Sequence, residues 1–430
     1  MDQHSTPTRR QLLKTSVVLV GAGAAAGCVG GEDEGNGSGN GDTGDGGNGS
    51  GNGDAGNGGN SETDENGTDD NGMENGDDGM ENGDDNEMEN GSDGESGDGS
   101  YAVTMEPVGT VEFEAVPEAW AANNGSWADM GIALGRAPPE AVYLAGRYHT
   151  KLYDEIPGVS VDGDAVESLW TSKLDPEQFL ALGEEVDVLV MDPNFLVGRS
   201  DGIDENDIDR IESAGTPFFG NSSFSRGYEW HDYEYLSLYE AFEHMAELFQ
   251  ERERYKAFAA LHEEFQANVA DIVPPEDERP SVTIMWPQPA EAPEAFSPYL
   301  IDEGTSFKQW RDLGVEDAFA TTDVEDFHAG RARIDYELLL QIDPDVLLIR
   351  GNEAKTAAEF RDTVLSFMES HNVASELTAV GNGDVYRGGP LYQGPITNMV
   401  LTERAASQVY GVEEELFDRQ RVADIVAGEF

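Results

Sequence analysis

The sequence predicts an α/β protein with two similar lobes joined by one long, rigid helix. Three observations lead to this fold class. A long amphipathic stretch lies in the middle of the globular part of the chain, strands alternate with helices on both sides of it, and a short motif occurs once on each side.

The central stretch runs from about residue 234 to 270 and contains no proline and no glycine. Its apolar residues recur mostly at three- and four-residue steps, as on one face of a helix. A single helix of this length would reach roughly 55 Å. The run Glu251-Arg252-Glu253-Arg254 excludes a membrane span, and no heptad is sustained. We therefore expect a connecting helix over 234–273, and the alternative is two ordinary helices with a break near Glu251.

The flanking segments read as short strands and helices. Pro176 stands at the first turn of a helix, where proline is well tolerated, and the apolar run 186–191 is typical of a buried parallel strand. Pro274-Pro275 ends the central helix. We expect strands at 111–116, 141–145, 186–191, 217–219, 282–286, 346–349 and 385–386, and helices at 126–135, 175–182, 208–214, 306–313, 336–342, 356–370 and 397–410.

The repeated motif supports two like lobes. Asp175-Pro176-Glu177 begins a helix that is followed by Asp187-Val188-Leu189, and Asp335-Tyr336-Glu337 begins one that is followed by Asp345-Val346-Leu347. Both copies read as a helix leading into a buried strand. Helix-then-strand units are common, so this repeat favours the two-lobe arrangement without proving it.

The composition is strongly acidic. The chain has 430 residues, 87 Asp plus Glu against 25 Lys plus Arg, and a formal net charge of -62. Such charge destabilises a compact state by self-repulsion, which molar salt screens because the Debye length falls to about 3 Å. Only six basic residues are lysine. We expect a protein from a halophilic archaeon, and the lack of a basic patch argues against nucleic-acid binding.

Residues 1–28 read as an export signal. Arg9-Arg10 resembles a twin-arginine motif, and an uncharged run leads to Ala25-Ala26-Gly27-Cys28, which resembles a lipobox. In such signals the cysteine becomes the lipidated first residue. The alternative is a chance apolar segment with a buried cysteine. Cys28 is the only cysteine, so no intrachain disulfide can form.

Residues 29–100 are rich in Gly, Asn, Asp and Glu and almost devoid of apolar residues. No core can form from this composition, so we expect a disordered acidic tether. Its spacing does not meet the EF-hand pattern. The remaining chain divides into an N-terminal lobe at 101–233, the connecting helix at 234–273 and a C-terminal lobe at 274–430.

Four stretches resemble the solute-binding proteins of ATP-driven import systems, in the branch of ferric-siderophore and cobalamin receptors. They are residues 174–191, 208–217, 306–315 and 334–349, the last followed by Gly383-Asp384-Val385-Tyr386 and a closing helix. Glu184-Glu185 stands where the family usually has Pro-Asp, which leaves the register there uncertain. The resemblance implies Rossmann-like lobes with a ligand cleft between them, no enzymatic activity and no cofactor, and a ferric siderophore or corrinoid as ligand.

The resemblance also implies site residues. Lys173 precedes the first-lobe helix where hydroxamate binders place a basic residue, and Tyr392 matches an aromatic before the closing helix. The chemistry of bulky, oxygen-rimmed ligands favours aromatic faces and arginines in the loops at strand ends. The expected ligand contacts are Lys173, Phe195, Arg226, Trp286, Arg331, Arg333, Arg387 and Tyr392. The alternatives to ligand contact are surface ion pairs for the arginines and core positions for the aromatic residues.

Glu177 and Glu337 occupy equivalent helix starts in the two lobes and resemble the pair that docks to the membrane permease. Carboxylates also favour the positive end of a helix dipole, which is a local explanation. The expected partners are therefore an ABC permease with its ATPase, and the membrane through a lipid on Cys28. We expect a monomer on the extracellular face of the cytoplasmic membrane.

Two other functions stay open. A Zn or Mn receptor of the related cluster would need about three histidines and a carboxylate around one ion, yet the seven histidines are scattered. An exported hydrolase is the weaker alternative, because the chain has no Gly-x-Ser-x-Gly, no His-Glu-x-x-His and no usable cysteine nucleophile.

Overall fold

The computed structural model describes residues 99–170, 173–199, 202–226, 228 and 230–430. They fall within one compact unit, Glu95–Phe430. The expected signal, Cys28 and all but the last two residues of the expected tether lie outside the described residues. Among the helices that are described, none combines the length and apolar character needed to cross a membrane.

The first lobe contains a parallel sheet in the order β5-β4-β3-β6. Leu189 in its last strand also pairs with Phe218, so the short segment expected at 217–219 lies beside the sheet. A hairpin precedes it. The strands are β1 (Tyr101–Met105), β2 (Gly109–Phe113), β3 (Trp120–Ala122), β4 (Ala141–Val142), β5 (Glu167–Ser168) and β6 (Val188–Val190). The helices are α2 (Gly125–Ala133), α3 (Pro176–Leu182), α4 (Pro193–Arg199) and α5 (Glu205–Ser213).

The second lobe contains a mixed sheet in the order β11-β10-β7-β8, with β9 paired to β7. Only β8 is antiparallel to its neighbour. The strands are β7 (Ser281–Gln288), β8 (Ala295–Tyr299), β9 (Glu316–Asp317), β10 (Val346–Ile349) and β11 (Val385–Arg387). The helices are α8 (Lys308–Asp312), α9 (Phe327–Gly330), α10 (Tyr336–Ile342), α11 (Ala357–Phe360), α12 (Ser366–Ser370), α13 (Thr378–Asn382), α14 (Pro395–Tyr410) and α15 (Arg419–Ala427), with a π-helix at Arg361–Leu365 between α11 and α12.

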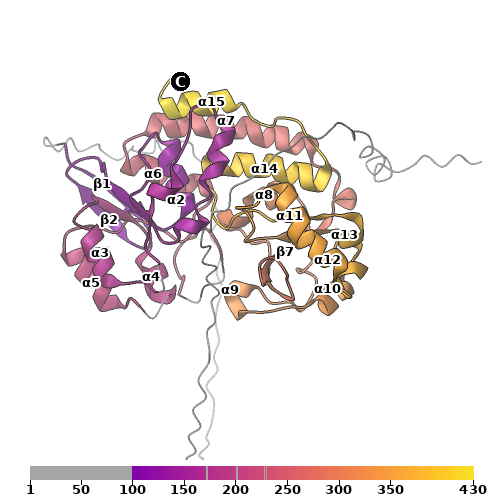
Figure 1. Ribbon diagram of the computed structural model, residues 1–430. Helices are drawn as coiled ribbons and strands as arrows, with labels where there is room; N and C mark the ends of the chain where they lie inside the picture. Colours follow the sequence, from indigo (N-terminus) through magenta and orange to yellow (C-terminus); the bar gives the residue numbers. More distant parts are fainter. Residues whose placement is uncertain (1–98, 171–172, 200–201, 227, 229) are drawn as a thin grey trace, which may run out of the picture. The chain divides into compact units, whose positions relative to one another are not determined.

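The expected connecting segment consists of two helices, α6 (Leu238–Leu248) and α7 (Arg252–Ile272). Gln250 between them has a left-handed backbone, φ 54°, and Glu251 N donates to Ala246 O at 2.8 Å, which closes α6. One unbroken helix over 234–273 was therefore wrong in extent, and the alternative with a break near Glu251 is correct. The fold class of two α/β lobes joined by a long helix is confirmed, with α7 as that helix (Figure 1).

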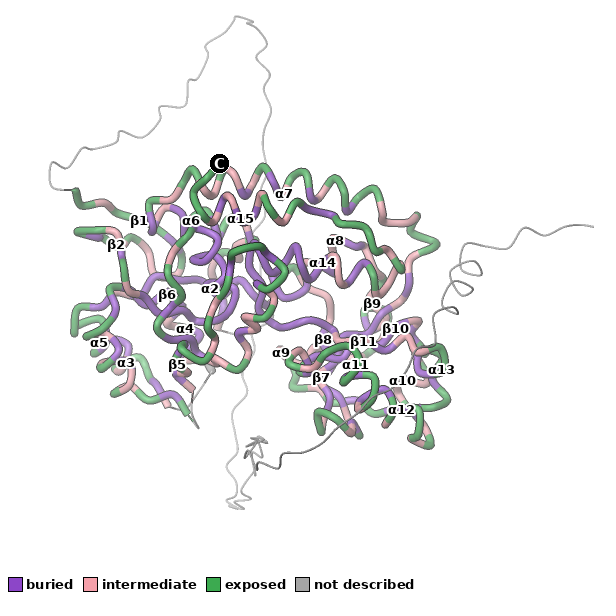
Figure 2. The backbone as a smooth tube through the Cα atoms, turned by 45° about the horizontal axis from the view of Figure 1, so that its top comes forward, coloured by how far each residue is buried: buried purple, intermediate pink, exposed green. Residues whose placement is uncertain are grey.

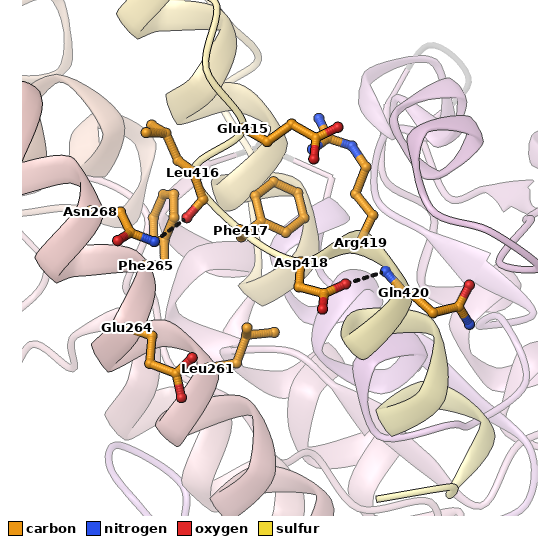
Figure 3. Close-up of a pocket in the computed structure, with 10 residues that line it drawn as sticks. All are labelled: Leu261, Glu264, Phe265, Asn268, Glu415, Leu416, Phe417, Asp418, Arg419 and Gln420. Carbon is orange, nitrogen blue, oxygen red and sulfur yellow. Dashed lines mark hydrogen bonds between the residues drawn. The ribbon is translucent and has the colours of Figure 1, made fainter.

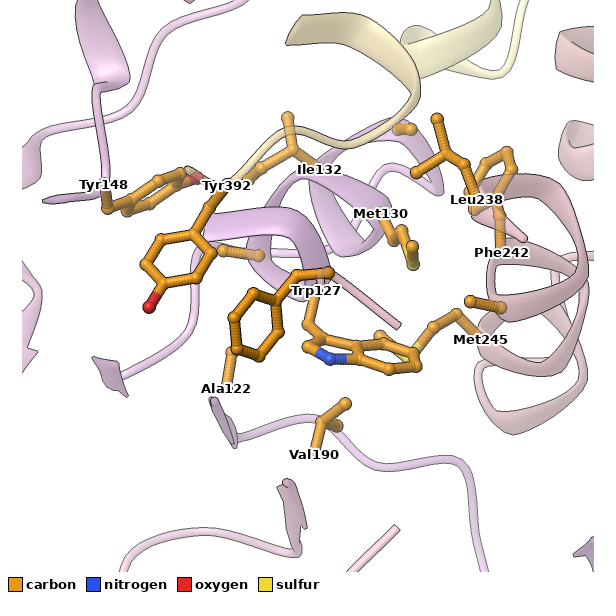
Figure 4. Packing of buried hydrophobic residues seen from close by; sticks show 14 of the residues in the cluster. Ala122, Trp127, Met130, Ile132, Tyr148, Val190, Leu238, Phe242, Met245 and Tyr392 are labelled. Carbon is orange, nitrogen blue, oxygen red and sulfur yellow. The ribbon is translucent and has the colours of Figure 1, made fainter. Parts of the chain in front are cut away.

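The main core lies where α2 meets α6. Trp127 and Met130 of α2 pack among Phe242 and Met245 of α6, and all four side chains are almost fully buried (Figure 4). Burying such side chains is the largest favourable contribution to folding. In contrast, α7 keeps a mostly exposed outer face beside α15 (Figure 2). The amphipathic stripe read from the sequence therefore serves to attach α7 to the lobes along one side.

Candidate ligand cleft

The two lobes face each other through loops at the carboxyl ends of their strands, the edge at which open α/β sheets bind ligands. Three contacts join the lobes at this edge. The rings of Phe224 and Tyr392 lie 5.4 Å apart. The Arg147 guanidinium lies 4.9 Å from the Trp286 ring. The Ser225 hydroxyl lies 2.9 Å from His328 Nδ1. These contacts bridge the junction at which the ligand cleft is expected.

A first-lobe segment, Asn221–Arg226, pairs with the second lobe through its backbone. Thr305 N donates to Ser223 O at 3.0 Å, and Ser306 N donates to Phe224 O at 3.0 Å. Gly304 allows this close approach, because a Cβ there would lie 2.4 Å from Phe224 O. This segment lines the junction between the lobes.

Aromatic side chains form the first-lobe side of the junction. Phe195, which is 1% exposed, packs edge-to-face against Tyr143, Phe224 and Trp230, at ring separations of 5.3, 5.7 and 6.2 Å. Phe224 in turn contacts Tyr392 of the second lobe. Two of the expected ligand contacts, Phe195 and Tyr392, thus belong to one aromatic cluster. The expected contact Trp286 lies at the cleft under Arg147.

Arg350 follows β10 directly and is 0% exposed. Its Nη2 donates to Ser306 O at 2.7 Å, whereas Nε and Nη1 have no hydrogen-bond partner among the described residues. The guanidinium lies over the rings of Phe307 and Tyr299, at 4.6 and 5.5 Å. Burial lowers its pKa to about 10, and it stays charged at neutral pH. Two unmet donors on a buried cation are costly unless a ligand supplies the acceptor.

A second charged cluster spans the lobes near the cleft. The Glu353 carboxylate accepts from Arg404 Nη2 at 2.7 Å and from Gly389 N at 3.0 Å. The positive charges of Arg404 and Arg387 outweigh burial and lower its pKa. Burial lowers the pKa of His149 in the first lobe. The nearby Glu353 charge acts to raise this pKa, and the Arg404 charge acts to lower it. The expected contact Arg387 is therefore paired within the protein, with Lys355 O accepting from its Nη1.

Four other expected residues lie apart from the aromatic cluster or face solvent. Lys173, Arg331 and Arg333 are exposed. Arg331 ends α9 with a left-handed backbone and lies 5.1 Å from the Phe327 ring. Arg226 joins the lobes differently, because its backbone N donates to Asp302 Oδ2 at 2.8 Å and its guanidinium lies 3.8 Å from the Tyr235 ring.

The two expected docking glutamates are exposed at the first turns of α3 and α10. Glu177 Oε1 accepts from Arg210 Nη2 at 2.8 Å. Both side chains of this pair are more than half exposed, so the pair adds little stability.

Arg147, Phe224 and Arg350 were not among the expected ligand contacts, although Phe224 and Arg350 lie in loops expected at the carboxyl ends of strands. Arg350 carried a usable signal, because it stands directly after the continuous apolar strand 346–349 and strand ends form the binding edge. Phe224 and Arg147 carried the same signal less directly, because they follow the expected strands 217–219 and 141–145 by five and two residues.

Within the described ranges, no group of three or more His, Cys, Asp or Glu side chains is placed to hold a metal ion. His231 is stacked between Tyr233 and Tyr235, with ring centroids 3.8 and 3.6 Å away. Burial and the nearby Arg226 charge lower its pKa to about 4, so it is neutral at physiological pH.

One cavity of about 580 Å³ lies elsewhere, between α7 and the segment leading into α15 (Figure 3). Asn268 Nδ2 donates to Leu416 O at 2.9 Å across it, and Leu261 and Phe265 supply apolar surface. None of the expected ligand contacts lines this cavity.

Comparison with known proteins agrees with the fold. Residues 187–391 match the family model described as periplasmic binding protein. A periplasmic binding protein from Veillonella parvula superposes with a TM-score of 0.50 and 14% identity, covering 73% of this chain and 99% of that chain. A point variant of heme binding protein HmuT gives a TM-score of 0.50 and 16% identity, covering 72% and 85%.

The triscatecholate siderophore binding protein FeuA from Bacillus subtilis gives a TM-score of 0.49 and 16% identity, covering 71% of this chain and 96% of that chain. The search of curated proteins found no match. At these identities the superpositions show the fold alone. The chain therefore has the fold of the periplasmic binding proteins, and residues 187–391 carry that family's sequence pattern.

Proposed function

We propose that the protein is an extracytoplasmic solute-binding receptor that captures an iron chelate and delivers it to an ABC importer. The single observation that carries the ligand class is Arg350. A fully buried guanidinium with two unmet donors, at the carboxyl end of a central strand, is suited to an anionic oxygen of a ligand.

The aromatic surroundings support a large ligand. Phe224, Phe195, Tyr392 and Trp286 present ring faces and edges around the junction between the lobes. Such surfaces suit flat or propeller-shaped chelates rimmed with oxygens. An anionic ferric siderophore satisfies Arg350 better than a neutral corrinoid does, so the corrinoid is the second choice within the same function.

The proposed delivery of the ligand to the importer uses one exposed glutamate on each lobe. Glu177 and Glu337 are exposed at equivalent helix starts, where permease arginines can reach them. A lipid on Cys28 would hold the receptor on the extracellular face of the cytoplasmic membrane, with the permease and its ATPase as partners and the receptor itself a monomer. A Zn or Mn receptor is not favoured by any arrangement of donor side chains in the described residues.

The test is thermal melting of the purified protein in molar KCl with a panel of ligands. The panel contains a ferric trihydroxamate, a ferric triscatecholate, heme, cobalamin, and Zn or Mn ions. A ligand at a hundred times its dissociation constant stabilises by about 2.7 kcal/mol, which moves the melting temperature measurably. We expect a shift with an anionic ferric chelate. The proposal would be contradicted if bare metal ions alone shifted the melting temperature, or if no ligand of the panel shifted it.

A further inference from the structure

The turn that carries Tyr392 belongs to the second lobe in sequence but is attached to the first lobe. Gln393 N donates to Ser126 Oγ of α2 at 3.1 Å. Tyr392 also lies against Gly125, where an added Cβ would come within 3.3 Å of the Tyr392 Cβ. The position of this aromatic side chain therefore depends on α2.

Asp129 of α2 is the main attachment. Its Oδ2 accepts from Ile396 N at 2.9 Å, from Thr397 N at 3.0 Å and from Thr397 Oγ1 at 3.1 Å. These groups form the first turn of α14, whose own N-cap residue, Gly394, has no side chain to offer. Asp129 thus caps a helix from the opposite lobe. A Cβ on Gly394 would lie 2.5 Å from Asp129 Oδ2, so glycine is required there.

The carboxyl group is fully buried and surrounded by tyrosines. Tyr148 and Tyr153 approach it from the loop after β4, and Tyr239 from α6. Burial raises the pKa values of all three hydroxyls, so none ionises near neutral pH. Burial also raises the pKa of Asp129 to about 6, although its hydrogen bonds act in the opposite direction. Asp129 is therefore the group around this cap that titrates between pH 4 and 8.

We propose that Asp129 is a positioning residue of the ligand cleft: through the α14 cap it fixes the Leu391–Gly394 turn, and thereby Tyr392, for ligand binding. The inference rests on the proposed function for its ligand but makes a separate statement about the turn. An asparagine at this position keeps an acceptor oxygen of the same shape but loses the negative charge that strengthens bonds from N–H donors. Asp129→Asn should loosen the turn while relieving the cost of a buried charge.

The experiment compares the wild type with Asp129→Asn and with Asp335→Asn as a matched control. Asp335 is an exposed N-cap whose Oδ1 accepts from Leu338 N at 3.0 Å on α10, so the same chemical change is made at an ordinary cap. Hydrogen exchange of the peptide covering residues 391–398 is measured without ligand. The melting temperature and the dissociation constant for a ferric triscatecholate probe are measured at pH 7.5 and pH 5.

In Asp129→Asn we expect the backbone amides of residues 391–398 to exchange hydrogen at least tenfold faster at pH 7.5 than in the wild type. The variant should bind the probe about tenfold more weakly. Its melting temperature should equal or exceed that of the wild type. At pH 5 the two proteins should bind the probe alike, because the wild-type carboxyl is then neutral. Asp335→Asn should change neither exchange at 391–398 nor affinity.

Unchanged exchange at 391–398 in Asp129→Asn overturns the inference whether or not the probe binds. Faster exchange with unchanged affinity removes the role in ligand binding. If the wild type binds no probe, the proposed function fails, and exchange alone then decides whether Asp129 fixes the turn. Should Asp129→Asn fail to fold, the wild type alone gives the test: exchange at 391–398, corrected for the intrinsic pH dependence of exchange, should be faster at pH 5 than at pH 7.5, and equal protection at the two pH values would overturn the inference.

Discussion

At the scale of single residues, the buried charges between the lobes support the proposed ligand binding better than the exposed charges do. Arg350 has one hydrogen bond from its guanidinium and two unmet nitrogens in a site with 0% exposure. An unmet buried charge lowers the free energy of unfolding, and in the proposed receptor an anionic ligand would supply the missing acceptor. The exposed arginines expected from the sequence lack this feature.

Arg350→Met should therefore separate stability from binding. Removing the unpaired charge while keeping a long apolar side chain should leave the melting temperature unchanged or raise it. The affinity for an anionic ferric triscatecholate should fall at least tenfold, whereas any affinity for neutral cobalamin should be unaffected. Titration calorimetry and thermal melting give both quantities. Arg361→Met, at an exposed position on the helix after α11, is the control, and equal effects of the two variants would contradict the role of Arg350.

Asp129 also makes a prediction about pH. Burial raises the pKa of the Asp129 carboxyl from its ordinary 3.8 to about 6 in the folded protein, so its contribution to stability is fully present below about pH 4 and is lost as the pH rises through 6. Raising the pH from 4 to 7.5 should cost the wild type about 2 kcal/mol more than Asp129→Asn, because the unfolded carboxyl is already partly ionised at pH 4. Denaturant unfolding of both proteins at each pH measures this difference. Parallel curves for the two proteins would rule out a raised pKa.

At the scale of elements, the break between α6 and α7 is set by local backbone geometry. Gln250 adopts φ 54°, a conformation that costs a residue with a side chain roughly 1 kcal/mol and costs glycine nothing. Its side chain also donates to Glu247 O at 2.7 Å on the surface. Gln250→Gly should thus stabilise the protein by about 0.5 kcal/mol, and Gln250→Ala should destabilise it slightly. If glycine were no better than alanine in denaturant unfolding, the break would not be fixed in this conformation.

The elements differ in how well the sequence predicts them. The bounds of α10 and β10 match the expectation, since each has a regular apolar pattern and an aspartate just before it. The strand β3 was missed because Trp120-Ala121-Ala122 is too short to show a period, and only its pairing with β4 and β6 makes it a strand. The long stretch 234–273 was read as one helix because no glycine or proline marks the break.

The site is less predictable than the fold for a physical reason. A sequence shows which loops follow strands, but the loops meet their partners only after the lobes pack. Phe195 and Tyr392 were expected in the site and share one aromatic cluster, and Trp286 lies at the same junction. Arg331 and Arg333 were expected from the chemistry of arginine in loops, and both side chains are exposed in the structure. The capping of α14 by Asp129 joins residues about 270 positions apart and leaves no local pattern.

At the scale of the whole molecule, one glutamate on each lobe makes a prediction about transport. Glu177 and Glu337 lie at the first turns of α3 and α10, away from the cleft contacts. Replacing both with lysine should reduce uptake through the cognate importer at least tenfold, because like charges would then oppose the permease arginines. Ligand affinity should be unchanged. Glu359→Lys with Glu276→Lys, two exposed positions elsewhere, is the matched control, and an equal loss of uptake there would indicate a general charge effect.

The overall negative charge leads us to predict how the melting temperature depends on salt. A formal charge of -62 includes exposed runs on the folded unit, such as Glu276–Glu278 and Glu413–Glu415, whose mutual repulsion favours unfolding at low salt. We expect the melting temperature to rise steeply as KCl increases from 0.05 to 1 M and to level off beyond it, because the Debye length is by then about 3 Å. This would support a halophilic origin. Replacing exposed Glu413 and Glu414 with glutamine should reduce the salt dependence while raising stability at low salt. Sucrose at matched osmolality is the control for solvent exclusion. A melting temperature that responds equally to sucrose and KCl would show that repulsion between carboxylates does not limit stability.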